Sequence, residues 1–341
     1  MISVKGVARA VIVVAAVVLA AGGARADVFN MGAGLTSLEF VTVDNADNDP
    51  DDTGYGAVAY EYNIGKYEVT AGQYCEFLNA VAVTDTYGLY NTNMWSSDYG
   101  CKVERTDTGS GYSYSVASDW ANRPVNYVSW GDAARFANWL TNGQPTGVQG
   151  LSTTEDGSYY LNGATTNAAL LAVTRKANAR YVIPTEDEWY KAAYHKNDGV
   201  TGNYWDYPTG TNSVPSNDLV DPDPGNNANF AVSWPGDVTI GSPYWRTPVG
   251  EFENSESPYG TFDQGGNVWE WNEAILSGSH RGDRGGSFNH GDDGMLVAYR
   301  HHNSPANEPL SMGFRVATPE PATLLLLALG GAALAARRRK G

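Results

Sequence analysis

The sequence predicts a domain built from a few short helices and strands that are joined by very long ordered loops. Short amphipathic segments with helix-start signals occur at three places. The stretches between them, such as 91–120, 143–179 and 199–260, show almost no hydrophobic period. Glycine is abundant, with 39 residues and no collagen-like repeat, which is typical of a chain with many turns. Loops of this length need support from aromatic packing, a disulfide or metal ions.

Each expected helix begins at a capping box, in which two residues three positions apart bond to each other's backbone N–H groups. The pairs are Thr70 with Gln73, Ser129 with Asp132, and Thr185 with Glu188. Short strands are expected over 28–43, 60–69 and 181–184. The chain of 341 residues is long enough for one large domain or two ordinary ones.

The first 26 residues predict a secretory signal peptide. Lys5 and Arg9 precede an unbroken apolar run over 11–21, and an A-x-A cleavage site follows at 24–26. The apolar run is too short to span a membrane as a helix. The mature chain is therefore expected to begin at Asp27, with an uncleaved anchor as the alternative.

Residues 318–341 predict a second targeting signal, at the C-terminal end of the sequence. Pro319, Glu320 and Pro321 precede an apolar stretch over 322–336 and a cluster of basic residues. At about 1.5 Å per residue this stretch covers only about 22 Å, against a hydrocarbon core of about 30 Å. The pattern resembles the PEP-CTERM sorting signal, which implies an exosortase-type sorting enzyme as partner and a transient inner-membrane anchor. Release to the cell surface or extracellular matrix would follow, and a plain C-terminal anchor is the alternative.

The net charge and the two cysteines limit which partners and functions the sequence allows. The formal net charge of −16 repels nucleic acid, so a nucleic-acid partner is not expected. The two cysteines, Cys75 and Cys101, predict one disulfide in an exported protein. Closing that loop could contribute about 3 kcal/mol to stability. A catalytic cysteine pair is the alternative.

Six segments, occurring in order, resemble the formylglycine-generating enzyme, or sulfatase-modifying factor, family. The most specific are GNVWEW at 266–271, RGGSF at 284–288 and GFR at 313–315. The others lie within 67–80, 122–140 and 181–194. The resemblance implies a single α+β domain over 27–317, low in regular secondary structure, with long ordered loops and related to C-type lectin-like domains.

The resemblance also implies calcium as a cofactor. The matching ligands are the side chains of Asp263 and Glu270 with the carbonyls of Gly266 and Val268. Oxygen ligands of this kind suit Ca²⁺, and a glycine-rich turn lets carbonyls point inward. A second calcium site would involve Asn229 and Phe230. The alternative is that these residues serve only as turn and capping residues.

The family's chemistry depends on two cysteines that bind copper(I), and neither is present. The corresponding positions are near His290 and Met295, so copper is not expected and no catalytic residue is assigned. The sequence therefore favours a non-catalytic surface or matrix module that binds a peptide or glycan. A divergent oxidoreductase acting on a protein cysteine, with copper held by His290, Met295, His301 and His302, is one alternative. A structural matrix protein is the other. Arg284, Arg300 and Arg315 are expected to brace the loops through carboxylates such as Glu270.

Overall fold

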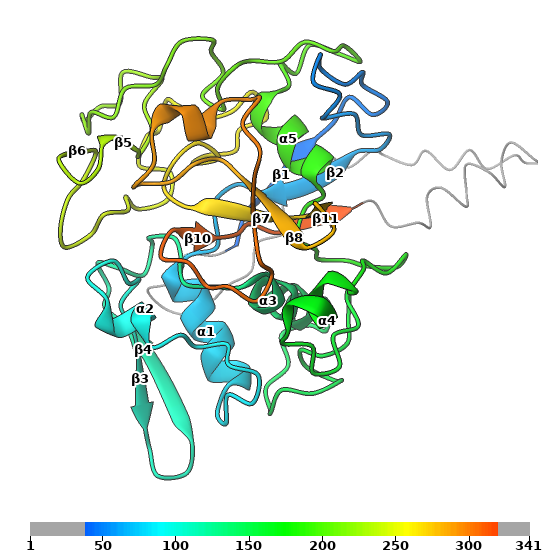
Figure 1. Ribbon diagram of the computed structural model, residues 1–341, viewed down its shortest axis with the longest axis vertical. Helices are drawn as coiled ribbons and strands as arrows, with labels where there is room; N and C mark the ends of the chain where they lie inside the picture. Colours follow the sequence, from blue (N-terminus) through cyan, green and yellow to red (C-terminus); the bar gives the residue numbers. More distant parts are fainter. Residues whose placement is uncertain (1–37, 320–341) are drawn as a thin grey trace, which may run out of the picture.

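The computed structural model describes residues 38–319 (Figure 1). The predicted signal peptide over 1–26 and most of the predicted sorting signal, including Glu320 and Pro321, lie outside these residues. Pro319 is the last residue described. Within the described range, no helix is long and apolar enough to cross a membrane.

The three helices predicted from capping boxes are confirmed. They are α1 (Ala71–Val81), α3 (Trp130–Thr141) and α5 (Glu186–Tyr194), and both bonds of each capping box are present. The shorter helices α2 (Asn93–Ser96), α4 (Asn167–Leu171) and the 3-10 turn η1 (Asp292–Met295) lie in the long loops. The sequence did not predict these because each covers less than two turns.

The strands form two small sheets and two hairpins. The first sheet has the order β1-β2-β11, from β1 (Phe40–Val43), β2 (Tyr62–Gly65) and β11 (Ala317–Pro319). The second has the order β10-β7-β8-β9, from β10 (Met312–Gly313), β7 (Trp269–Leu276), β8 (His280–Arg284) and β9 (His301–Asn303). The hairpins are β3 (Val103–Asp107) with β4 (Tyr112–Val116), and β5 (Ala231–Ser233) with β6 (Asp237–Val238).

Helices α1 and α3 lie on one side of the second sheet and α5 lies on the other (Figure 1). Aromatic rings fill the core between them. Phe136 of α3 lies 5.3 Å from Phe77 of α1 and 5.4 Å from Phe314, measured between ring centroids. This confirms the α+β fold with little regular structure, and it shows that buried rings support the loops. The strands predicted at 60–69 and 181–184 are shorter than expected, since the second is a single bridge between Val182 and Ala317.

The predicted disulfide is not formed in the structure. In the described part of the chain, Cys75 and Cys101 are both free, buried thiols in the main hydrophobic core. Burial raises the pKa of Cys75 to about 12, and burial also raises the pKa of Cys101. Because disulfide formation proceeds through a thiolate, burial in this apolar setting works against the pairing once the domain has folded.

Candidate functional site

The site is centred on Glu270, the second residue of β7. Its carboxylate is fully buried and receives two hydrogen bonds from Arg315, from Nε and Nη2, both of 2.6 Å. The indole Nε1 of Trp189, on α5, donates a third bond of 2.7 Å. Strand β10 runs parallel to β7 and places Arg315 just beyond its end. The expected bracing of the loops by arginines is confirmed here.

The same bracing holds helix α5 to the second sheet. Glu186, in the first turn of α5, forms ion pairs with both Arg284 and Arg300. Arg284 is buried and its Nη1 also donates to the carbonyl of Tyr299 at 2.8 Å. Glu186 therefore ties α5 to β8 and to the segment before β9. All three arginines predicted to brace loops do so through glutamates.

Glu68 is a site residue that the sequence did not single out. It is 1% exposed, and it accepts hydrogen bonds from the backbone N–H of Val268 at 3.2 Å and from Asn267 Nδ2 at 3.3 Å. Burial, together with the charges of Asp263 and Glu270, raises the pKa of Glu68 well above its usual range. Its only signal in the sequence is a carboxylate between the apolar residues Tyr67 and Val69.

Asp263 completes a group of three carboxylates around one guanidinium. It accepts a 2.7 Å hydrogen bond from the backbone N–H of Gly250, and loss of hydration raises its pKa to about 6. Its backbone has φ of 59°, so the chain turns sharply at this residue. Loss of hydration and mutual repulsion make Glu68 and Asp263 hold their protons more tightly than exposed carboxyl groups do, while Glu270 is paired with Arg315.

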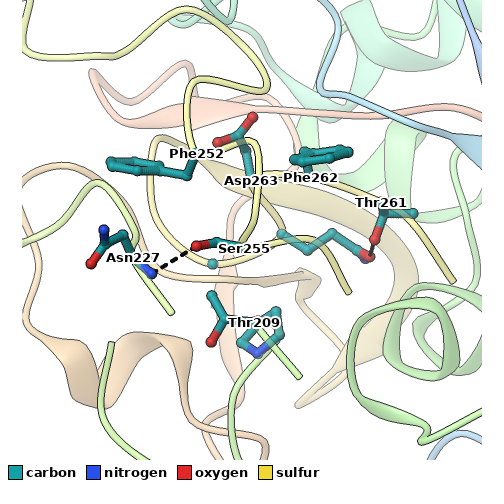
Figure 2. A pocket seen from close by; sticks show the side chains of 10 residues that line it. Thr209, Asn227, Phe252, Ser255, Thr261, Phe262 and Asp263 are labelled. Atoms are coloured by element: carbon teal, nitrogen blue, oxygen red, sulfur yellow. Dashed lines mark hydrogen bonds between the residues drawn. The ribbon is translucent and has the colours of Figure 1, made fainter. Parts of the chain in front are cut away.

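A narrow pocket lies beside Asp263, with a volume of about 10 Å³, which is room for about one water molecule. Figure 2 shows Asp263 between the rings of Phe252 and Phe262, with Ser255 and Thr209 further into the pocket. The hydroxyl of Ser255 accepts a 2.9 Å hydrogen bond from the backbone N–H of Asn227. The oxygen-rich lining suits water or a hard cation rather than an apolar ligand.

The structure brings the two predicted calcium segments together. Asn229 forms a parallel bridge with Gly266, and its carbonyl accepts the N–H of Asn267 at 2.9 Å. A Cβ on Gly266 would lie 2.3 Å from that carbonyl oxygen, and φ is 93°, so only glycine fits. Phe230, in contrast, is buried in an apolar cluster. The resemblance gave these segments as two separate sites, and 36 residues lie between Asn229 and Gly266.

His290 and Met295, near the positions of the family's cysteines, have different surroundings. His290 Nδ1 lies 2.7 Å from the hydroxyl of Ser287 and accepts a 3.2 Å bond from the indole of Trp269. Met295 is fully buried, and its side chain packs in the apolar cluster that contains Phe230. The two side chains therefore face a polar surface loop and an apolar core, respectively.

His301 joins His290 at Trp269 but is held by a carboxylate. Its ring stacks on Trp269 at 4.9 Å, and its Nδ1 lies 2.6 Å from Asp283, which raises the pKa of His301. His302 contacts His280 instead, with ring centroids 4.7 Å apart. Over residues 38–319, no group of three or more His, Cys, Asp or Glu side chains is arranged to hold a metal ion. A calcium site at Asp263 and Glu270 would need backbone carbonyls to complete it.

Comparisons with known proteins agree with the fold. The family model described as a sulfatase-modifying factor enzyme 1-like domain matches residues 16–319, and the PEP-CTERM protein-sorting motif matches residues 317–340. No curated protein matches the chain in sequence.

Three solved structures resemble the chain. Variable protein 1 of Treponema denticola has 19% identity and a TM-score of 0.52, over 86% of this chain and 98% of that one. The structure titled CarF has 20% identity and a TM-score of 0.47, over 83% and 98%. PvdO from Pseudomonas aeruginosa has 16% identity and a TM-score of 0.45, over 86% and 98%. At 19% identity, the first similarity shows the fold alone.

Proposed function

Because the chain belongs to the sulfatase-modifying factor enzyme 1-like family, we propose that its domain is a non-catalytic relative that binds a glycan or peptide. The sorting motif indicates an exported, transiently membrane-anchored protein and implies sorting by an exosortase. We place its final location at the cell surface or in the extracellular matrix. There, calcium is available to stabilise the fold.

The replacement of two thiolates by His290 and Met295 carries this proposal. Copper(I) prefers soft thiolate ligands. His290 Nδ1 already interacts with Ser287 and Trp269, and the Met295 side chain is enclosed by apolar residues. These residues do not fit the family's copper centre, so no oxidation step is assigned to the domain.

Exposed aromatic side chains support a binding role. Trp95, in the short helix α2, is 45% exposed, and Trp234, in the turn between β5 and β6, is 37% exposed. Large rings at a surface give much contact area with little loss of conformational entropy, and Trp N–H adds a polar contact. They suit a glycan or a peptide ligand equally.

Calcium would bind at the group of carboxylates described above. Asp263 and Glu270 would provide carboxylate oxygens, and Gly266 and Val268 would provide carbonyls. A divalent cation would stabilise the ionised carboxylates of Glu68 and Asp263, whose pKa values are raised in its absence. Both oxygens of Glu270 already bind Arg315, so calcium would share this carboxylate with the guanidinium. Its role would be structural, since it would link the turn before β7 to the core.

One experiment tests the non-catalytic assignment. The purified chain is incubated with copper and a cysteine-containing sulfatase peptide, and the peptide mass is measured. No aldehyde product is expected. Aldehyde formation that disappears in His290→Ala would overturn the assignment and favour the divergent oxidoreductase. Glycan and peptide arrays test the binding role. If the protein binds nothing on either array, a structural matrix protein is favoured.

A further inference from the structure

Arg246 carries a buried charge that no glutamate or aspartate of the described residues pairs with. Its side chain is 0% exposed, and its Nη1 donates a 2.7 Å hydrogen bond to the carbonyl of Tyr99. Its Nε and Nη2 have no hydrogen-bond partner among residues 38–319. Burial lowers the pKa of this guanidinium to about 10. Unsatisfied buried donors are costly, so this arrangement needs an explanation.

The Nε and Nη2 atoms form one edge of the guanidinium, and other arginines of the same chain show what this edge normally binds. In three of them, Nε and Nη2 donate together to one carboxylate, at 2.6 to 3.0 Å: Arg135 to Glu155, Arg300 to Glu186, and Arg315 to Glu270. The two parallel N–H groups match the two oxygens of a carboxylate. Arg246 offers the same edge, buried to the same degree as that of Arg315.

Further unpaired polar atoms gather around Arg246. Asn126 Nδ2 donates to the same Tyr99 carbonyl at 2.8 Å, and Asn229 Nδ2 donates to the carbonyl of Trp245 at 3.0 Å. The Oδ1 atoms of both asparagines and Nε1 of Trp245 lack partners within the described residues. Five of the seven unpaired buried side-chain atoms of that range thus belong to this one neighbourhood. Such a concentration leaves hydrogen-bonding capacity for water or a polar ligand in this one neighbourhood.

The neighbourhood is also locally cationic in an acidic protein. Arg123 donates a hydrogen bond to the carbonyl of Arg246, and its charge contributes to the lowered pKa of Arg246. Arg123 itself lies over the ring of Tyr244, with its Cζ 4.0 Å from the centroid. The chain as a whole carries a formal charge of −16. The two guanidinium groups would attract an anion, against the charges of Glu68, Asp119 and Glu251 that also act on them.

Four aromatic residues form a cluster that reaches Arg246 through Phe288, and we call them the ring cluster: Tyr99, Trp234, Trp245 and Phe288. Neighbouring rings within it lie 5.0 to 6.4 Å apart between centroids. The guanidinium carbon of Arg246 lies 5.5 Å from the centroid of Phe288. Trp234, directly after β5, is the exposed member, so a ligand would first meet its indole.

We propose that the Nε and Nη2 edge of Arg246 binds the carboxylate of an acidic sugar whose ring stacks on the ring cluster. This inference rests on the proposed binding function and names its ligand class. A carboxylate supplies the two acceptors, and the C–H face of a sugar ring matches a flat indole. The full burial of Arg246 favours a single compact acidic group that enters past Trp234. An aliphatic peptide with a free carboxylate shares the first contact but lacks the C–H face of a sugar ring to stack on Trp234.

The test is calorimetric titration of the full chain with glucuronate and with glucose. Glucuronate is expected to bind roughly tenfold or more tightly than glucose, as a charged bidentate hydrogen bond requires. Arg246→Lys should remove this preference because an ammonium group cannot bind both oxygens side by side. Trp234→Ala should weaken both sugars. Arg300→Lys removes an equivalent edge that already binds Glu186, and it should leave both affinities unchanged.

Several outcomes would overturn the inference. Equal affinities for glucuronate and glucose would reject it while leaving the binding function standing, and binding of neither sugar nor peptide would reject both. A peptide with a free C-terminal carboxylate that displaces glucuronate, and that outbinds it in an Arg246-dependent way, would reject the sugar. Should Arg246→Lys fail to fold, glucuronamide replaces it as the test. This neutral amide must bind the unaltered protein as weakly as glucose, and binding as tight as that of glucuronate would reject the inference.

Discussion

Two buried guanidinium groups of this protein have opposite surroundings. Arg315 lies among three carboxylates and binds Glu270 with two hydrogen bonds of 2.6 Å. Arg246 is buried equally, but it is bonded to a backbone carbonyl and lies against the ring of Phe288. The first arrangement ties distant segments together, whereas the second leaves its hydrogen-bonding capacity unused within the fold. Buried charge thus stabilises the structure in one region and is available for a ligand in the other.

The largest effect is expected where the paired charge is broken. Arg315→Met should lower the free energy of unfolding by about 3–5 kcal/mol, since Glu270 is left as a buried charge without its partner. Denaturant unfolding measures the change. Arg300→Met is the matched control, because this half-buried side chain shares Glu186 with Arg284, and it should cost about 1 kcal/mol or less. Similar losses in both variants would contradict the distinction.

Calcium should have the next largest effect, through the same group of carboxylates. If the ion is present at about 100 times its dissociation constant, it adds about 2.7 kcal/mol to stability. Chelation is therefore expected to lower the melting temperature, and Asp263→Ala should remove that response. Below about pH 6 the response should also fade, because the raised pKa of Asp263 lets protons compete with the ion. A melting curve that chelation leaves unchanged would reject the calcium site.

A third kind of buried charge is a pair of carboxyl groups that bind each other instead of a guanidinium. Its effect on stability depends on pH. Glu308 lies beside Asp132, and burial with the nearby charge of Asp132 raises the pKa of Glu308 to about 9. The folded state holds this proton more tightly than the unfolded state does, so its stabilising contribution is complete below about pH 4 and is lost as pH rises to 9. Glu308→Gln should flatten the fall in melting temperature over this range. An identical pH profile in the variant would count against the shared proton.

The smallest effect on stability is expected at Arg246. Arg246→Met replaces a buried, largely unpaired charge with an apolar side chain, so the unfolding free energy should change by less than about 1 kcal/mol or increase. This result would set Arg246 apart from Arg315 in the same denaturant measurement. A loss of more than about 3 kcal/mol would show that Arg246 serves the fold and not a ligand.

The sequence was sufficient to predict where the helices begin and to which fold class the domain belongs. A capping box involves residues three positions apart, so Thr70 with Gln73 and Ser129 with Asp132 define helix starts before any tertiary contact forms. The motifs at 266–271, 284–288 and 313–315 were sufficient to indicate the family, and the bracing role of Arg315 followed from the charge balance. The calcium ligands and the binding role stay predictions.

Only the tertiary structure decided which distant residues meet. Glu68 and Val268 are 200 positions apart, and Asn229 meets Gly266 across a loop without hydrophobic period. Arg315 lies in the motif at 313–315, but nothing local to either arginine shows which groups will surround its guanidinium. Their difference arises because folding places Glu270 beside one and the ring of Phe288 against the other. The sequence determines where helices begin, but the environment of a buried charge depends on long-range packing.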